Sequence, residues 1–386
     1  MIVFFLGRDS HLARAELMAV FPGLREASCD GRKLVADGVS EQDVRSAFPR
    51  LGGTVKAALQ VADAKDVRAW IAAAVTYLAS KSKAGSKTTF GVSGDAPKFD
   101  RFRAGRDIKA ALKAKGISAR FVNKDNSDVP TPIVLREKLD DAGTELHALS
   151  TPSGLVLAAT VAVQDIDAYT ARDMNRQRDL KVGMLPPKLA QILVNLAVGT
   201  DSGKGVWDPF AGLGGVLSEA VRSGARRVVA GDVSARVLAL AKQNVEAAVK
   251  ALESHVRMDF YEADARTLTR QLVFGFRDCV VVTEGFLGSP FAGGRVPTVL
   301  ARKEQEFVGP FYSEFLASLR AGGYQGRAVI CAPSWHLASG DDLSIDVPAM
   351  AKAMGAKVVR TVDDTASYLY RRPDQAVGRE IYTLDF

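Results

Sequence analysis

Residues 206–215 are the segment best suited to binding chemistry, and they read VWDPFAGLGG. A short apolar strand runs into Asp208 and Pro209, and a turn with Gly212 and Gly214 follows. Glycines let a ligand approach the backbone closely at the carboxyl end of a first strand. Pyrophosphate-binding turns favour the spacing G-x-G-x-x-G, which this segment lacks. Because an acid repels a phosphate and attracts a cation, the segment predicts a site for a positively charged small molecule.

Acidic residues also follow the next two expected strands. Asp232 ends the run of residues 227–232, and Asp264 follows the third strand. A carboxylate about 20 residues after a glycine turn can bind ribose hydroxyls, and the third acid suits an adenine amino group. Alone, Asp232 is better explained as a helix N-cap, but three acids in order favour a cofactor site. S-adenosylmethionine carries a sulfonium and an ammonium and no phosphate, so we expect it rather than NAD. The expected contacts are Asp208, Pro209, Phe210, Gly212, Gly214, Asp232, Val233, Asp264, Ala265 and Pro186.

The loop after the fourth expected strand, residues 278–283, would lie at the mouth of the same cleft. A nucleobase amino group is a weak nucleophile because its lone pair is delocalised. It needs an acceptor for its N–H and an aromatic surface that stacks the base. We expect Glu284 and Phe286 to supply these, with Thr283 and Pro290 completing the catalytic set. The alternative interpretation is a tight turn with a buried phenylalanine.

These side chains require a sheet whose strands end at one edge. From Lys188 onward the pattern alternates helix, strand and glycine-rich turn, which is typical of a doubly wound α/β domain with a mostly parallel sheet. Residues 165–188 are polar and charged and end near Pro186 and Pro187, which predicts a linker. The region before it predicts an α+β fold. Strands are expected at residues 3–6, 33–36, 55–61, 88–92, 119–122, 145–149 and 155–163, and helices at 11–21, 41–48, 66–80 and 103–115.

One segment carries the whole positive excess of the 386-residue chain, whose net charge is +7. Residues 81–138 contain 14 Lys or Arg and 6 Asp or Glu, so the remainder sums to about −1. A localised basic face suits a polyanion, because each phosphate contact releases counterions. On charge alone, a solvated surface that binds nothing explains the segment equally well.

The cysteines and histidines indicate neither a metal site nor a disulfide framework. Cys29, Cys279 and Cys331 are far apart and odd in number, which favours a reducing, cytoplasmic location. No two of the four histidines form a ligand pair, so no metal is expected. No run approaches the roughly 18 apolar residues of a membrane helix, and residues 1–6 predict a first strand rather than a signal peptide. The sequence does not fix the oligomeric state, and a monomer is one expectation.

Several segments resemble THUMP-containing tRNA guanosine N2-methyltransferases. Residues 208–212 (DPFAG) resemble the DPFCG turn of amino-methyltransferases that act on DNA and RNA. Residues 183–191 (GMLPPKLAQ), preceded by two Arg-Asp pairs at 172–173 and 178–179, resemble the linker and cofactor-entry motif of the family, and this string is highly specific. The resemblance continues at the N-terminus, in residues 51–56 (LGGTVK), and in the last hairpin, residues 371–386. It spans nearly the whole chain.

The resemblance implies a ferredoxin-like domain (1–62), a THUMP domain (63–165), a linker (166–187) and a Rossmann-like methyltransferase domain (188–386). It implies the N2 amino group of a tRNA guanosine as target, with position 10 first among the sites. THUMP domains of the family bind the tRNA acceptor end, and the basic segment falls within that range. The residues we expect to contact RNA are Lys98, Arg101, Arg103, Arg106, Lys109, Arg172 and Arg176.

The expected catalytic loop departs from the family pattern, which reads DPPY or NPPY where this chain has Thr283-Glu284-Gly285-Phe286. Glu284 can replace the acidic or amide acceptor, and Phe286 can replace the tyrosine. The changed geometry leaves two other readings open. One is a methyltransferase acting on an rRNA guanosine or a DNA base, and the other is a non-catalytic RNA-binding protein. An NAD-dependent oxidoreductase is disfavoured by the glycine pattern.

Overall fold

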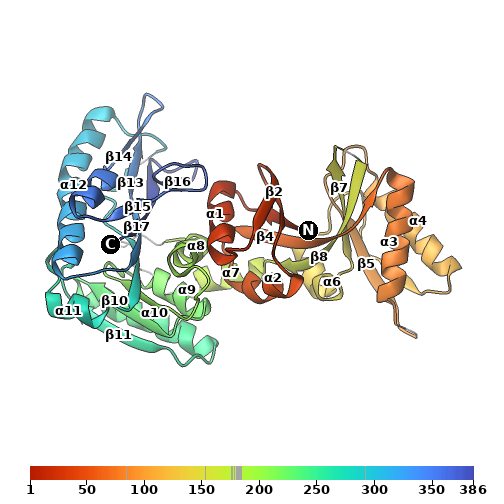
Figure 1. Ribbon diagram of the computed structural model, residues 1–386, viewed down its shortest axis with the longest axis horizontal. Coiled ribbons are helices and arrows are strands. Elements are labelled where there is room, and N and C mark those ends of the chain that lie inside the picture. The colour runs from red at the N-terminus through yellow and green to blue at the C-terminus, as the bar shows by residue number, and fades with distance from the viewer. Residues whose placement is uncertain (84, 153, 175–176, 178, 180–184, 292) are drawn as a thin grey trace. The chain divides into compact units, whose positions relative to one another are not determined.

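The computed structural model describes residues 1–386 except 84, 153, 175–176, 178, 180–184 and 292 (Figure 1). The chain divides into two compact units. The first contains residues 1–10, 23–49 and 54–171, and the second contains residues 11–22, 50–53 and 172–386. The chain therefore enters the second unit twice before its main contribution begins. No helix among the described residues is long and apolar enough to cross a bilayer.

A single sheet of order β2-β3-β1-β4-β8-β7-β5-β6 organises the first unit. The strands are β1 (Ile2–Leu6), β2 (Arg25–Asp30), β3 (Lys33–Asp37), β4 (Thr54–Ala64), β5 (Thr88–Ser93), β6 (Ala119–Phe121), β7 (Glu145–Thr151) and β8 (Gly154–Val163). The helices are α2 (Glu41–Ala47), α3 (Val67–Lys81), α4 (Arg101–Ala114), α5 (Thr131–Arg136) and α6 (Leu139–Ala142). One sheet thus spans both N-terminal segments, and their division into ferredoxin-like and THUMP domains stays a prediction.

The second unit is built on a doubly wound sheet of order β11-β10-β9-β12-β13-β17-β15. Its strands are β9 (Gly205–Asp208), β10 (Arg227–Asp232), β11 (Arg257–Glu262), β12 (Cys279–Glu284), β13 (Arg327–His336), β15 (Lys357–Val359) and β17 (Val377–Asp385), with β14 (Asp342–Ser344) on β13 and β16 (Tyr368–Tyr370) on β17. The first five strands run parallel, and β17 is antiparallel to β13, β15 and β16. The strand order reverses between β9 and β12, where such sheets bind ligands. The expected doubly wound α/β fold is confirmed.

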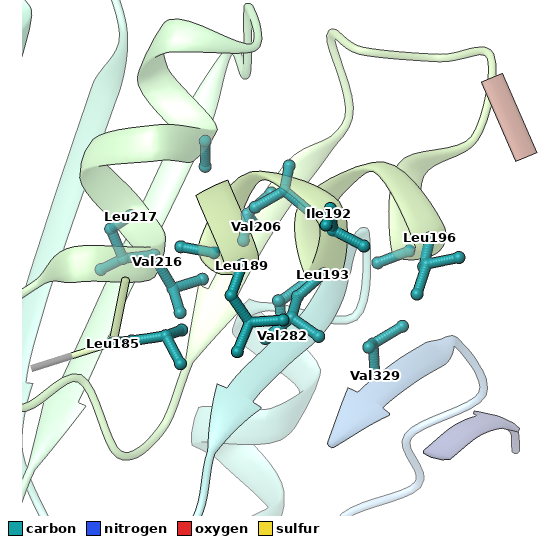
Figure 2. Close-up of a cluster of buried hydrophobic side chains, with 14 of the residues drawn as sticks. Leu185, Leu189, Ile192, Leu193, Leu196, Val206, Val216, Leu217, Val282 and Val329 are labelled. Carbon is teal, nitrogen blue, oxygen red and sulfur yellow. The ribbon is translucent and has the colours of Figure 1, made fainter. Parts of the chain in front are cut away.

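Helices cover both faces of this sheet: α8 (Pro187–Val198), α9 (Gly215–Arg222), α10 (Ala235–Ala251), α11 (Arg270–Gly275), α12 (Thr298–Ala321) and α13 (Val347–Ala353). Alternate residues of a strand point to opposite faces. Accordingly Val206 and Val282 join one core with Leu189 and Leu193 of α8 (Figure 2). Trp207 and its neighbours on the other face join a second core, under α12. These two cores fix the strand ends that carry the acidic residues.

The N-terminal helix α1 (Ser10–Val20) packs with the second unit rather than the first. Its Leu12 and Ala15 lie in the same core as α8. Glu16 is fully buried, and it accepts hydrogen bonds from the Gly52 and Gly53 amides, each at 2.8 Å, and from Asn195 Nδ2 at 2.7 Å. The segment predicted as a linker, residues 166–187, begins with helix α7 (Ile166–Met174), so the first part of this linker is a regular helix.

Candidate functional site

A cavity of about 790 Å³ lies at the carboxyl ends of the parallel strands of the second unit. This volume falls in the range of small-molecule and cofactor sites. The loops after β9, β10, β11 and β12 line it, together with residues at the start of β17. The sequence-predicted residues among the lining are Asp208, Pro209, Phe210, Gly212, Asp232, Val233, Asp264, Ala265, Glu284, Phe286 and Pro290. Gly214, Thr283 and Pro186 are outside the lining.

The glycine turn after β9 is closed against the neighbouring strand. Gly212 and Gly214 have φ of 50° and 75°, the left-handed region that favours glycine. A Cβ on Gly214 would also lie only 3.0 Å from the Ala241 carbonyl oxygen. The Gly212 amide donates to Asp232 Oδ2 at 3.0 Å. Because the Gly212 amide already donates its hydrogen bond to a carboxylate, it is not free to bind a phosphate, and the turn is poorly suited to a phosphate group.

Asp208 is the buried carboxyl group of the site, with 2% of its surface exposed. The Thr283 hydroxyl donates to its Oδ1 at 2.6 Å, and the Phe210 amide donates to the same oxygen at 3.1 Å. Burial, with smaller contributions from the negative charges of Asp232 and Glu284, outweighs these hydrogen bonds and raises the pKa of Asp208 to about 7. A cation placed beside Asp208 would therefore stabilise its ionised form. Thr283 is fully buried and positions Asp208, and its place in the catalytic set stays a prediction.

The two acids after β10 and β11 differ in their partners. Asp232 accepts from the amides of Gly212 and Ser234, the latter at 2.9 Å, and Ser234 is the N-cap of α10. Asp264 caps a short 3-10 turn and binds Arg266 Nη2 at 2.6 Å, and the Arg266 guanidinium lowers the pKa of this carboxyl. Arg266, which also lines the cavity, was not predicted from the sequence. An adenine amino group at Asp264 would share the carboxylate with this arginine.

Glu284 at the end of β12 forms an ion pair with Arg379 of β17, through Oε1 and Nε. Arg379 is only 8% exposed and lines the cavity. Burial alone would lower the pKa of Arg379, but the Glu284 carboxylate outweighs it and raises the pKa, so the guanidinium stays charged. The sequence analysis missed Arg379. The available signal was an arginine inside a strand that is otherwise mostly buried, because arginine is seldom buried without a partner.

Phe286 stands at the cavity with 42% of its surface exposed. Its ring centroid lies 5.8 Å from that of Phe311 and 6.0 Å from that of Phe307, both on α12. The Tyr312 hydroxyl donates to the Phe286 carbonyl at 3.1 Å. A Cβ on Gly285 would lie 2.5 Å from the Tyr312 hydroxyl oxygen, so only glycine fits where the resembling family has proline.

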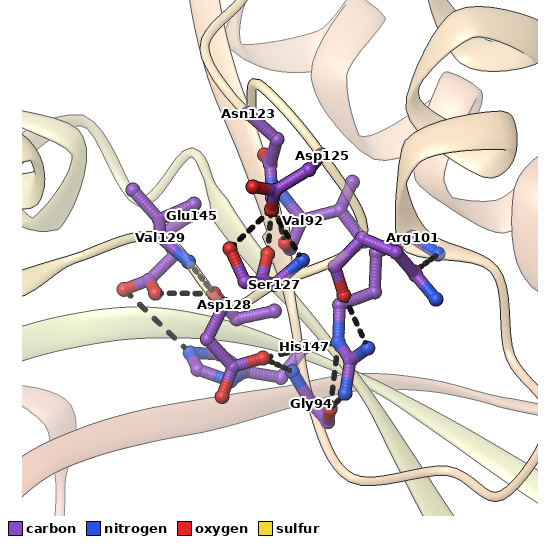
Figure 3. Close-up of polar contacts among 12 residues, drawn as sticks. Val92, Gly94, Arg101, Asn123, Asp125, Ser127, Asp128, Val129, Glu145 and His147 are labelled. Carbon is purple, nitrogen blue, oxygen red and sulfur yellow. Dashed lines mark hydrogen bonds and ion pairs between the residues drawn. The ribbon is translucent and has the colours of Figure 1, made fainter.

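The expected RNA-contacting residues divide into two groups. Lys98, Arg103, Arg106 and Lys109 are exposed, and the last three share one face of α4 because they are three residues apart. Arg101 instead donates to the Gly94 carbonyl and pairs with Asp128 at 3.0 Å (Figure 3).

Two arginines of the prediction remain, Arg172 and Arg176, and the structure describes only the first, which lies in the second unit. Arg172 pairs with the buried Glu219 at 3.2 Å. Arg176 lies outside the described residues. Arg101 and Arg172 therefore have structural partners within the chain. No group of three His, Cys, Asp or Glu side chains within the described part of the chain could hold a metal ion.

Comparison with known proteins gives limited matches. No family model matches the chain. A stretch of 112 residues, 29% of the chain, is 29% identical to a "tRNA (guanine(10)-N2)-dimethyltransferase" of Methanothermobacter thermautotrophicus. The chain spans only 33% of the length of this curated relative.

Two solved structures are similar over nearly the whole chain. One is a "possible methylase" from Clostridium difficile 630, with 13% identity and a TM-score of 0.43 over 99% of this chain and 97% of that one. The other is a "predicted N6-adenine-specific DNA methylase" from Listeria monocytogenes, with 13% identity and a TM-score of 0.41 over 99% of this chain and 95% of that one.

Proposed function

We propose that this chain is an S-adenosylmethionine-dependent methyltransferase that acts on the N2 amino group of a tRNA guanosine, with guanosine 10 as the target. The observation that carries the proposal is the meeting of Asp208, Asp232 and Glu284 at one cavity at the strand ends. The 112-residue similarity to a tRNA (guanine(10)-N2)-dimethyltransferase supports the choice of substrate. Action on tRNA is also the basis on which we propose a cytoplasmic location.

The residues around the glycine turn fit this cofactor. When bound, S-adenosylmethionine supplies a methyl group on a positively charged sulfur. Asp208, whose pKa burial raises to about 7, gains from a neighbouring cation. Asp232 keeps lone pairs for ribose hydroxyls, since a carboxylate has about four acceptor sites and two amides occupy two of them. Val233 is 68% exposed at the rim, where it can cover an adenine ring.

The loop after β12 serves the methyl acceptor. Glu284 accepts an N–H of the guanine amino group and localises the nitrogen lone pair toward the reacting carbon. Phe286 offers a partly exposed aromatic face on which the flipped base can stack. Tyr312 and Gly285 hold this loop in place. The contribution of the chain is orientation and electrostatic preorganisation.

The first unit supplies RNA binding in this proposal. Residues 1–62 form the ferredoxin-like domain and residues 63–165 the THUMP domain, with the exposed face of α4 contacting phosphates. Phosphate contacts position an RNA without reading its sequence. Lys98, Arg103, Arg106 and Lys109 are exposed and therefore suited to this role. Arg101, Arg172 and Arg176 remain weaker candidates.

The test is methylation of a tRNA transcript by the full chain, followed by mass spectrometry of the nucleosides. We expect N2-methylated guanosine, and none when guanosine 10 is replaced by adenosine. Methylation that persists after this replacement would contradict the assigned position. An rRNA fragment and a DNA duplex, assayed in parallel, test the alternative substrates.

The altered loop, Thr283-Glu284-Gly285-Phe286, supports one other candidate, an RNA-binding protein without catalysis. Calorimetry with S-adenosylmethionine distinguishes the two. Binding of the cofactor together with methyl transfer supports the enzyme, whereas tRNA binding without either supports the alternative.

A further inference from the structure

The ion pair of Glu284 and Arg379 gives the cavity an acceptor directly beside a donor. We propose that Arg379 donates a hydrogen bond to O6 of the target base while Glu284 accepts its N–H groups, so that the pair selects guanine. This inference rests on the proposed function and assigns a substrate-reading role to Arg379, which lies in the resembling last hairpin but is not among the site residues expected from the sequence.

The Arg379 guanidinium has N–H donors that are not used within the described part of the protein. A guanidinium carries five N–H donors and no acceptor. Only Nε is engaged, with Glu284 Oε1, and among the described residues Arg379 has no other hydrogen-bond or ion-pair partner. Because the side chain lines the cavity, its terminal amino groups are available to a bound base.

The strand that carries Arg379 holds it rigidly. On one side Arg379 pairs in register with Pro333 of β13, and on the other with Tyr370 of β16. Glu284 pairs in register with Cys331 of β13, two residues from Pro333. Sites built on strands are positioned more accurately than sites on loops. The acceptor and the donor are therefore presented as a fixed pair.

This pair complements the Watson–Crick edge of guanine, which presents two N–H donors, at N2 and N1, followed by the O6 acceptor. A carboxylate only accepts and a guanidinium only donates, so Glu284 matches the first part of this edge and Arg379 the second. Flipped bases are read through this edge. A base that lacks a good acceptor at position 6 would leave a buried charged donor unpaired, which is costly.

The test replaces the single atom at position 6. A tRNA transcript is ligated with guanosine or 6-thioguanosine at position 10; the sulfur is a much weaker acceptor than oxygen, and N1–H and the N2 amino group are kept. Hydrogen bonds to charged groups are worth roughly a 10- to 100-fold change. We expect the natural protein to prefer guanosine by roughly this factor in kcat/KM. In Arg379→Ala the rate on guanosine should fall by a similar factor, and the preference should shrink toward one.

Two further variants separate reading from folding. Arg379→Lys keeps a donor and should retain part of the preference. Arg327→Ala is the matched control, because Arg327 of β13 also pairs with a carboxylate of a neighbouring strand, Asp385 of β17, yet does not line the cavity. It should leave the preference unchanged.

The results distinguish the inference from the proposed function. Equal rates of the natural protein on the two RNAs overturn the inference and leave the proposed function standing. Equal losses on both RNAs in Arg379→Ala also overturn it, since Arg379 would then act only by holding Glu284. If Arg379→Ala does not fold, the inference is tested by the preference of the natural protein and of Arg379→Lys for guanosine over 6-thioguanosine. No methylation of guanosine by the natural protein overturns both.

Discussion

The raised pKa of Asp208 predicts that binding of S-adenosylmethionine depends on pH. Its pKa is raised by burial from an ordinary 3.8 to about 7, which corresponds to roughly 4 kcal/mol against the ionised form. A positive charge about 4 Å from the carboxylate would recover an energy of about this size at an effective dielectric constant of about 20. The protein without ligand therefore holds Asp208 partly protonated at neutral pH, and a bound cation favours the ionised form.

The expected change in affinity follows from the ionised fraction. With a pKa of about 7, this fraction rises roughly eightfold from pH 6 to pH 7.5. We expect the Kd for S-adenosylmethionine to fall by roughly that factor over this range, which lies below the usual pKa of an α-amino group. Asp208→Asn should bind weakly and without this slope, because the amide does not titrate. Asp278→Asn is the matched control, since Asp278 is exposed next to the opposite end of β12.

Isothermal titration calorimetry at three pH values measures the slope directly. The free energy of unfolding, measured as a function of pH, gives a second test. A raised carboxyl pKa lowers the free energy of unfolding as pH rises from about 4 to 7. Stability measured by chemical denaturation should therefore fall less over this range in Asp208→Asn. Flat binding by the natural protein, or an unchanged slope in Asp208→Asn, would refute the reasoning.

Three further predictions concern the loop after β12 and the exposed basic face of α4. Glu284→Gln should lower kcat by roughly 100-fold or more while the Kd for S-adenosylmethionine changes less than about twofold, as single-turnover kinetics and calorimetry can measure. A loss of cofactor affinity instead would move Glu284 out of its assigned role. Gly285→Ala should lower activity, because its Cβ would lie 2.5, 2.7 and 2.8 Å from the hydroxyl oxygen, Cε1 and Cζ of Tyr312. Adding Tyr312→Phe should restore none of it, since both ring carbons remain; the double variant tests this. Reversing three charges of α4 should weaken tRNA binding and reduce its salt slope by about one per lost contact in filter-binding assays, and unchanged affinity would exclude this face. The three residues are Arg103, Arg106 and Lys109.

The acidic residues of the site could be predicted because their positions follow from local patterns. Asp208, Asp232 and Glu284 each end a strand of buried or mostly buried residues. Carboxyl ends of parallel strands meet at one edge, so the side chains gather without further information. The gathering around one cavity is as expected from the sequence.

Partners that are distant in sequence could not be predicted. Arg379 meets Glu284 across 95 positions of sequence, and only because β17 lies antiparallel beside β13. Residue type alone marked Arg101 as an RNA contact, yet the chain near Asn126 and Asp128 folds back onto it. Likewise, the expected helix at residues 11–21 is present as α1, but that expectation gave no sign of which core would receive its Leu12.

Placement of α1 in the second unit has a consequence for synthesis on the ribosome. The helix emerges first, but the α8 core that buries Leu12 and Ala15 and the Asn195 amide that binds Glu16 are made more than 170 residues later. Until then the apolar face of α1 has no native partner. The nascent chain is therefore exposed to chaperones or to wrong pairings for roughly 10 to 30 seconds at ordinary translation rates. The same dependence means that a fragment of the second unit expressed from residue 188 onward would lack a helix of its own core and would be prone to aggregate.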